Sequence, residues 1–152
     1  MVVRKKLQAG SQLRARAGEM RQVISNLLVN AIDATPAGGQ LTIRVRLGRE
    51  WKEPARNGVW ITVGDSGCGI ESRNQKRIFD PFWTTKKNTG TGLGLWVTRS
   101  IVNNSGGSIR VRSCIEPGRS GAVFSVFVST QAEATEGKTQ ADYPAEVKEE
   151  AG

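Results

Sequence analysis

The stretch GTGLGLWVTRSI, residues 90–101, places three glycines at alternate positions directly before an amphipathic pattern. Glycines this dense cost backbone entropy, which indicates either a turn that only glycine can make or a ligand that approaches the backbone closely. A glycine turn leading into a helix presents free N–H groups and the positive end of the helix dipole, which together bind anions. The spacing is GxGxG, and neither GxGxxG nor GxxxxGK followed by Ser or Thr occurs in the chain. The stretch therefore predicts an ordinary turn, or a phosphate site of neither the dinucleotide-binding nor the P-loop kind.

Outward from this stretch, apolar periodicity and turn residues divide the chain into helical and extended segments. The order of these segments predicts an α/β fold, a two-layer α/β sandwich with a mixed, mostly antiparallel sheet and helices on one face. The first two strands should form an antiparallel hairpin. We expect, in chain order, a helix over 19–35, strands over 40–47 and 59–65, a short helix near 72–78, an irregular segment over 80–91, a helix over 92–104, and strands within 106–114 and 122–129.

The chain of 152 residues is long enough for one domain, which we expect over residues 19–130. Residues 1–18 form a polar, basic lead-in with at most one short strand, and residues 131–152 are expected to be a disordered acidic tail. No apolar run has the length of a membrane span, and the first residues carry no apolar signal-peptide core. With only two cysteines, far apart, the sequence favours a reducing, cytoplasmic location.

The net charge of +8 is unevenly distributed. Residues 131–152 hold six acids and two lysines, net −4, whereas residues 1–130 carry 20 basic and 8 acidic residues, net +12. A basic body can bind nucleic acid, an acidic protein surface or a polyanionic small molecule. The arginines are scattered along the sequence without interleaved aromatics, so nucleic acid is not expected as a partner. The chain has no histidine, which removes the commonest general base, metal ligand and phosphoryl acceptor.

The first predicted helix carries an unusual polar stripe. Opposite its apolar face, at helical spacing, stand neutral amides and one acid, with no Lys or Arg among them. Such a stripe is either a solvated surface or an oxygen-rich surface for hydrated Mg²⁺ or a phosphate-bearing ligand, since hard cations take carbonyl and carboxylate oxygens. The residues of the stripe are Gln22, Asn26, Asn30 and Asp33.

The segment GDSGCGIE, residues 64–71, places Asp65 at the end of a strand and two glycines in the turn after it. Asp65 could accept a hydrogen bond from an exocyclic amine such as that of adenine, with Gly67 and Gly69 letting the base lie close. An Asp-initiated turn explains the same residues equally well.

The segment RIFDPFWTTKKNTGTGLGL, residues 77–95, begins with an apolar cluster and continues with two lysines and the glycine stretch. An apolar anchor followed by a polar, glycine-rich span is what a hinged lid over a ligand requires.

The four segments in this order resemble the ATP-binding catalytic domain of sensor histidine kinases, and most closely the nitrogen-sensor type. This domain belongs to the superfamily shared with gyrase, MutL-type repair proteins and heat-shock chaperones. NLLVNAIDA is similar to the family's asparagine box, DSGCGI to the first glycine box, FDPFWTTK to the phenylalanine box and GTGLGL to the second glycine box. The resemblance covers about residues 19–129 and implies a Bergerat-type ATP-binding fold with ATP and Mg²⁺ as cofactors.

The resemblance also implies roles for individual residues. Asn30 would ligate Mg²⁺, Asn26 would orient phosphate or water, and Asp65 would bind the adenine amino group. Lys86 or Lys87 would neutralise phosphate charge, which makes Asn26 and Lys86 the candidate catalytic residues. The implied nucleotide-binding positions are Asn26, Asn30, Asp33, Asp65, Gly67, Gly69, Ile70, Phe82, Lys86, Lys87, Gly90, Thr91, Gly92, Leu93, Gly94 and Leu95.

Three positions depart from the family pattern. Asn26 stands where the hydrolysing members of the superfamily carry a glutamate, and because an amide cannot act as a general base this favours a kinase over an ATPase. Asp33 stands where many histidine kinases have a basic residue, and Ala122 where members often have threonine near the adenine.

The absence of histidine from the chain determines which partners we expect. The resemblance implies transfer to a histidine on a separate helical dimerisation domain, and from there to a response regulator, so this chain should be inactive alone. We expect ATP and ADP as ligands, no nucleic acid, and no membrane insertion by this chain. Two alternatives remain: a stand-alone serine kinase of the anti-sigma type, and a non-catalytic module that senses nucleotide.

Overall fold

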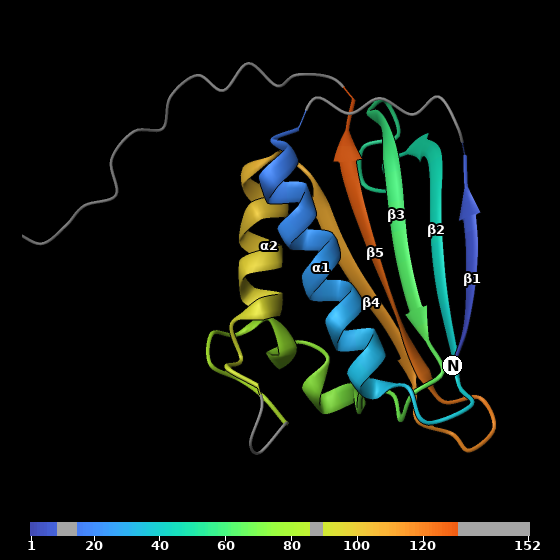
Figure 1. Cartoon of the computed structure of the whole chain (residues 1–152). Helices are drawn as coiled ribbons and strands as arrows, with labels where there is room; N and C mark the ends of the chain where they lie inside the picture. Colours follow the sequence, from blue (N-terminus) through green and yellow to red (C-terminus); the bar gives the residue numbers. More distant parts are fainter. Residues whose placement is uncertain (9–14, 86–89, 131–152) are drawn as a thin grey trace, which may run out of the picture.

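The computed structural model describes residues 1–8, 15–85 and 90–130 as a five-stranded sheet with helices on one face (Figure 1). The strand order is β1-β2-β3-β5-β4; β1 and β2 are parallel and every other neighbouring pair is antiparallel. This confirms the predicted two-layer α/β fold with a mixed sheet. The elements are β1 (Val2–Leu7), α1 (Ala17–Ala34), β2 (Gln40–Arg49), β3 (Asn57–Asp65), the 3₁₀ helices η1 (Ser72–Asn74) and η2 (Arg77–Phe79), α2 (Gly94–Asn104), β4 (Ser108–Cys114) and β5 (Gly121–Ser129).

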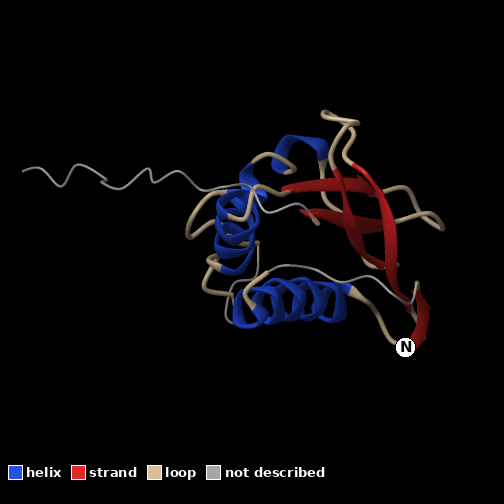
Figure 2. Ribbon diagram, turned by 90° about the horizontal axis from the view of Figure 1, so that it is seen from above, coloured by secondary structure: helices blue, strands red, loops and turns tan. Residues whose placement is uncertain are grey.

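The core lies between the sheet and the helices α1 and α2, which cover the same face of the sheet (Figure 2). The apolar residues of α1 recur at helical spacing, and Val23 and Leu27 are fully buried. Alternate residues of β3, among them Val59 and Val63, point into the same core because side chains of a strand alternate between its two faces. The predicted antiparallel hairpin forms between β2 and β3, and β4 and β5 form a second one.

Several predicted boundaries shift by one or two residues, and two differences have a local cause in the sequence. The helix expected near 72–78 is instead two short 3₁₀ turns. The second turn ends at Phe79 because Pro81 disfavours helical backbone at Asp80, whose ψ is 143°. The helix expected from Gly92 begins at Gly94, since Gly92 has a φ of +68° and belongs to the preceding turn.

The expected lead-in supplies the edge strand β1, which pairs in parallel with β2. No helix among the described residues has the length and apolarity to span a membrane. The tail predicted over residues 131–152 and the predicted site residues Lys86 and Lys87 lie outside the described residues.

Candidate nucleotide-binding site

Asp65, the last residue of β3, is held by two backbone groups. Its Oδ1 accepts hydrogen bonds from the N–H of Gly67, at 2.8 Å, and from the N–H of Ala122 in β5, at 3.2 Å. Among the described residues Oδ2 has no hydrogen-bond partner, and it is not a buried atom. Burial raises the pKa of the Asp65 carboxyl, and the two backbone hydrogen bonds partly oppose this rise. The Asp-initiated turn therefore forms, and it leaves one carboxylate oxygen free to accept a further hydrogen bond.

The glycines after Asp65 let the turn pack closely against two neighbours. A Cβ on Gly67 would collide with the carbonyl oxygen of Ala34, so the turn touches the C-terminal end of α1. Gly69 has a φ of +75°, and a Cβ there would collide with the carbonyl oxygen of Cys114 in β4. Both positions therefore require glycine, which explains the spacing in the sequence.

Ile70 continues this turn into contact with the second hairpin. Its N–H donates to the hydroxyl of Ser113, at 2.7 Å, and that hydroxyl donates to the carbonyl of Gly121, at 2.6 Å. Ser113 was not predicted from the sequence, because an alternating strand pattern does not reveal which serine supports a distant loop.

Asn26 joins the two long helices. Its side-chain amide donates to the carbonyl of Gly94, at 2.9 Å, and to the hydroxyl of Thr98, at 3.2 Å, while its oxygen accepts from the Gln22 amide, at 2.9 Å. The N-terminus of α2 therefore lies against the middle of α1. Thr98 is fully buried, and its place on the apolar stripe of α2, between Leu95 and Val102, is the signal that could have identified it.

The N-terminus of α2 has no side-chain cap from Leu93, the residue that precedes the helix. The first N–H groups of a helix have no partner within it, so an uncapped start presents them with the positive end of the helix dipole. The glycine stretch leads directly into this start, with Gly90 half-buried and Thr91 exposed.

The segment before the glycine stretch packs closely against it. A Cβ on Gly92 would collide with the backbone of Phe82, which itself has a φ of +64°. The Phe82 side chain is 74% exposed, so its backbone rather than its ring holds this contact.

The predicted residues thus meet along α1. The turn of Asp65 and Gly67 lies at its C-terminal end, and Gly94 lies beside Asn26. From Asn26 to Ala34 the helix rises about 12 Å, at 1.5 Å per residue. Between these ends stand the half-buried Asn30 and the exposed Asp33.

The donor set suits a divalent cation that shares its ligands with a nucleotide. Among the described residues no group of three or more His, Cys, Asp or Glu side chains could hold a metal ion by itself. Mg²⁺ keeps several waters and commonly binds through one or two protein oxygens together with substrate phosphates. The amide oxygen of Asn30 on the polar stripe therefore fits Mg²⁺ only as part of a Mg–nucleotide complex.

Comparison with known proteins gives consistent relatives in sequence and in structure. Residues 15–132 match the family described as histidine kinase-, DNA gyrase B- and HSP90-like ATPase. The chain is 40% identical over 118 residues to the signal transduction histidine-protein kinase AtoS of Escherichia coli (strain K12), covering 78% of this chain and 18% of AtoS. It is 44% identical over 117 residues to the sensor histidine kinase ZraS of Salmonella typhimurium (strain LT2), covering 77% of this chain and 23% of ZraS. The chain thus spans about a fifth of the length of these relatives.

Solved structures show the same fold. The nucleotide-free catalytic domain of the histidine kinase ThkA matches with a TM-score of 0.69 and 28% identity, over 85% of this chain and 78% of that one. The mycobacterial sensor histidine kinase MprB matches with a TM-score of 0.71 and 22% identity, over 87% of this chain and 85% of that one. The chain belongs to the family of histidine kinase-, DNA gyrase B- and HSP90-like ATPases, and within it to the ATP-binding domains of sensor histidine kinases.

Proposed function

We propose that residues 19–130 are the ATP-binding catalytic domain of a two-component sensor histidine kinase and present Mg–ATP to a histidine on a separate dimerisation domain. The observation that carries the proposal is the position of Asp65 and of the uncapped start of α2 at two points along the same polar stripe. One end suits a base with an exocyclic amine, and the other suits phosphates. We place the domain in the cytoplasm, where ATP is available.

The adenine end of the proposed site is the turn after β3. Oδ2 of Asp65 would accept a hydrogen bond from the adenine amino group, while Oδ1 stays on its two backbone donors. Gly67 and Gly69 keep the turn free of side-chain bulk, and Ile70 would give the base an apolar contact.

The phosphate end is the start of α2 and the glycine stretch before it. Free N–H groups and the helix dipole would stabilise the negative oxygens of the phosphates. Phe82 would pack near this end as part of the segment that contacts Gly92. Lys86 and Lys87, outside the described residues, would neutralise phosphate charge. The backbone positions concerned are Gly90, Thr91, Gly92, Leu93, Gly94 and Leu95.

The polar stripe of α1 would hold the metal. Asn30 would be the protein ligand of Mg²⁺, and Asp33, at the exposed edge, would contact the cation through water. When bound, the ion neutralises the charge that develops on the phosphoryl oxygens. Asn26 would orient the phosphates indirectly, by holding the start of α2 in place, because both of its described donor contacts go to Gly94 and Thr98. Because Asn26 cannot remove a proton from water, we expect slow ATP hydrolysis.

The acceptor must come from another domain, because this chain contains no histidine. Phosphoryl transfer depends chiefly on positioning and on electrostatic stabilisation, which the site could supply, whereas the nucleophile would be supplied in trans. The relatives AtoS and ZraS are histidine kinases, which favours this proposal over a serine kinase of the anti-sigma type.

The test is phosphoryl transfer from labelled Mg–ATP to the dimerisation domain of a related sensor histidine kinase. We expect acid-labile label on that domain only when this chain is present, and none on this chain alone. Acid-stable label would indicate a serine acceptor. Nucleotide binding without transfer to any dimerisation domain would favour a nucleotide-sensing module instead.

A further inference from the structure

One face of the sheet carries no helix (Figure 2), and the strand positions on that face are strongly basic. Residues such as Ile61 point into the core, so their neighbours along the strand point to the opposite face. The strand register places six cations on that face, and no Asp or Glu occupies a strand position there. We call this set the basic face, and it consists of Arg4 and Lys6 in β1, Arg44 and Arg46 in β2, and Arg110 and Arg112 in β4.

A small cavity of about 160 Å³ lies within the basic face. Trp51, from the loop between β2 and β3, lies over Trp60 with ring centroids 5.7 Å apart. The guanidinium carbons of Arg110 and Arg112 lie 4.6 and 5.1 Å from the centre of the Trp51 ring. Arg46 also lines the cavity, 6.0 Å from the centre of the Trp60 ring. Three guanidinium groups from two different strands therefore surround one hollow.

These three arginines form no ion pair with any acid among the described residues. Like charges held this close repel one another, and a bound anion would relieve the repulsion. A guanidinium that stacks on an aromatic ring keeps its in-plane N–H groups available for bidentate bonds to a carboxylate or phosphate. The hydroxyls of Thr62 and Ser125, 3.4 Å apart, add polar groups to the lining.

The arrangement of the rings disfavours nucleic acid as the occupant. Binding of single strands without sequence preference uses aromatic faces on which bases stack. Trp60 is only 2% exposed, and the ring of Trp51, which is 50% exposed, is contacted by two guanidinium groups. Carboxylates need no free aromatic ring, so an acidic peptide fits the cavity better than a single-stranded nucleic acid does.

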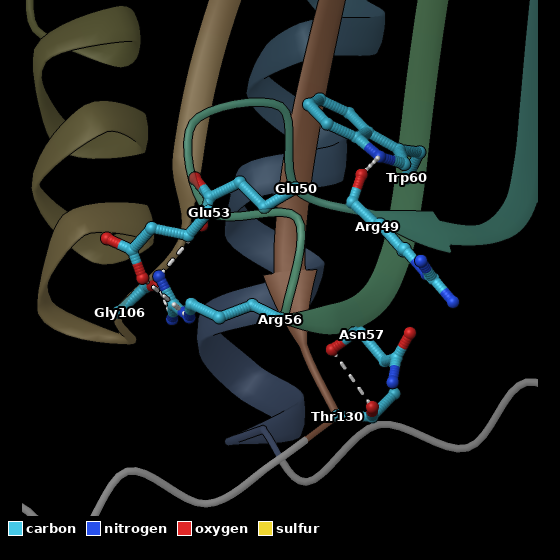
Figure 3. Close-up of polar contacts among 8 residues, drawn as sticks. All are labelled: Arg49, Glu50, Glu53, Arg56, Asn57, Trp60, Gly106 and Thr130. Carbon is cyan, nitrogen blue, oxygen red and sulfur yellow. Dashed lines mark hydrogen bonds and ion pairs between the residues drawn. The ribbon is translucent and has the colours of Figure 1, made fainter.

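An acidic peptide is attached to this molecule close by. Thr130 donates two hydrogen bonds, each 3.1 Å, from its N–H and its hydroxyl to the carbonyl of Asn57, beside the loop that carries Trp51 (Figure 3). The segment 131–152 follows directly and has a net charge of −4. The segment has 22 residues, and a random coil of that length has an end-to-end distance of about 25 Å, comparable to the length of a strand in this sheet. Attachment would give its carboxylates an effective concentration on the order of 1 mM.

We propose that the acidic segment 131–152 binds the basic face of the same molecule, with its carboxylates paired to Arg46, Arg110 and Arg112. This site differs from the proposed nucleotide site, in which Asn26 and the start of α2 lie on the helical side of the sheet. With its net charge of −4, the bound segment would offset part of the charge of the six cations and would compete with other polyanions for the basic face.

The test uses the full chain and the NMR signal of the Trp51 indole N–H, assigned by its loss in Trp51→Phe. Replacing the six acids of the segment by amides (E133Q, E136Q, D142N, E146Q, E149Q and E150Q) should move this signal. The difference from wild type should vanish at about 1 M salt, where the screening length falls to about 3 Å. A peptide of residues 131–152 added to the amide variant should restore the wild-type position, with half-saturation at or below about 1 mM.

Charge-matched variants serve as controls. In a background with R110Q and R112Q, the six amide substitutions should no longer move the Trp51 signal. In a background with R73Q and R119Q, at two arginines outside the strands that are each 81% exposed, they should move it as in wild type. K138Q with K148Q makes the segment more acidic, so a higher salt concentration should be needed to remove the difference in the Trp51 signal. Identical Trp51 signals in wild type and the six-amide variant would overturn the proposal. A Trp51 shift that depends on protein concentration would also overturn the proposal and would indicate binding of a second copy. A single-stranded oligonucleotide that binds wild type and the amide variant equally well would overturn it too.

Discussion

At the scale of single residues, the Asp65 carboxylate is held by two backbone N–H groups. Both of its described hydrogen bonds go to Oδ1, so its two oxygens are not equivalent. In Asp65→Asn the amide oxygen should take the Oδ1 position, because the backbone N–H groups there need an acceptor. The NH₂ group then replaces Oδ2 and presents a donor where an adenine amino group needs an acceptor.

Asp65→Asn should therefore weaken ATP and ADP binding at least about tenfold, or about 1.4 kcal/mol. The loss should exceed that in Asn26→Ala, because the base is contacted in every nucleotide state. Fluorescent-nucleotide titration measures both, with the exposed Glu116→Gln as the control. Equal affinities for wild type and Asp65→Asn would remove Asp65 from base recognition.

The raised pKa of Asp65 predicts a pH dependence with a definite sign. Burial disfavours the charged carboxylate, while a bound amino group favours it. Nucleotide affinity should thus be highest above this pKa and fall as the pH drops through it. In Asp65→Asn, nucleotide affinity should change less with pH over the same range. In the absence of nucleotide, the raised pKa means that the carboxylate disfavours the folded state, so Asp65→Asn should unfold no earlier than wild type at neutral pH.

Gly67 offers a stability test with a matched control. Gly67→Ala places a methyl against the Ala34 carbonyl and should destabilise the domain by about 1–3 kcal/mol. Gly18→Ala, in the first turn of α1 with nothing within 4 Å of the added Cβ, should be neutral or stabilise it by up to about 1 kcal/mol. Denaturant unfolding compares the two. A Gly67→Ala variant as stable as Gly18→Ala would contradict the close approach of the turn to α1.

At the scale of elements, α1 and α2 are coupled by one side chain. Asn26 donates to both Gly94 and Thr98, so it fixes the start of α2 against α1. Asn26→Ala and Thr98→Val should each cost about 1–2 kcal/mol, and the double variant clearly less than their sum, because the second change removes a contact already lost. Additive losses in unfolding experiments would mean that the two residues act independently.

A second link joins the β2–β3 loop to the turn after α2. Arg56 pairs with Glu50, which is only 5% exposed, and donates to the carbonyl of Gly106 (Figure 3). Arg56→Ala leaves a buried carboxylate without this partner and should cost about 3–5 kcal/mol in unfolding free energy. Arg119→Ala, at the surface pair with Glu116, should cost no more than about 1 kcal/mol. Similar losses of unfolding free energy in Arg56→Ala and Arg119→Ala would show that Glu50 is solvated.

The elements themselves were largely predictable, because their signals are local. The helical stripe of α1 and the alternation in β2 and β5 identify each element without its neighbours. The parallel pairing of β1 was not predicted, since parallel strands are joined through distant parts of the chain. The link from Asn26 to Thr98 was missed for the same reason, as 72 residues separate the two.

At the scale of the whole molecule, the sheet separates two surfaces of different character. On the helical side, the start of α2 lies beside Asn26, and the turn after Asp65 lies at the C-terminal end of α1. The other side gathers arginines that appear scattered in the sequence. Arg46 and Arg110 line one cavity only through the strand order and the packing of Trp51 against Trp60.

The most direct test of the account is titration of the whole chain with a fluorescent ATP analogue, with and without Mg²⁺, in competition with unlabelled ATP and ADP. We predict saturable binding that both nucleotides displace, that Asp65→Asn weakens, and that depends on Mg²⁺ more strongly for ATP than for ADP. No displaceable binding at millimolar nucleotide would contradict the account.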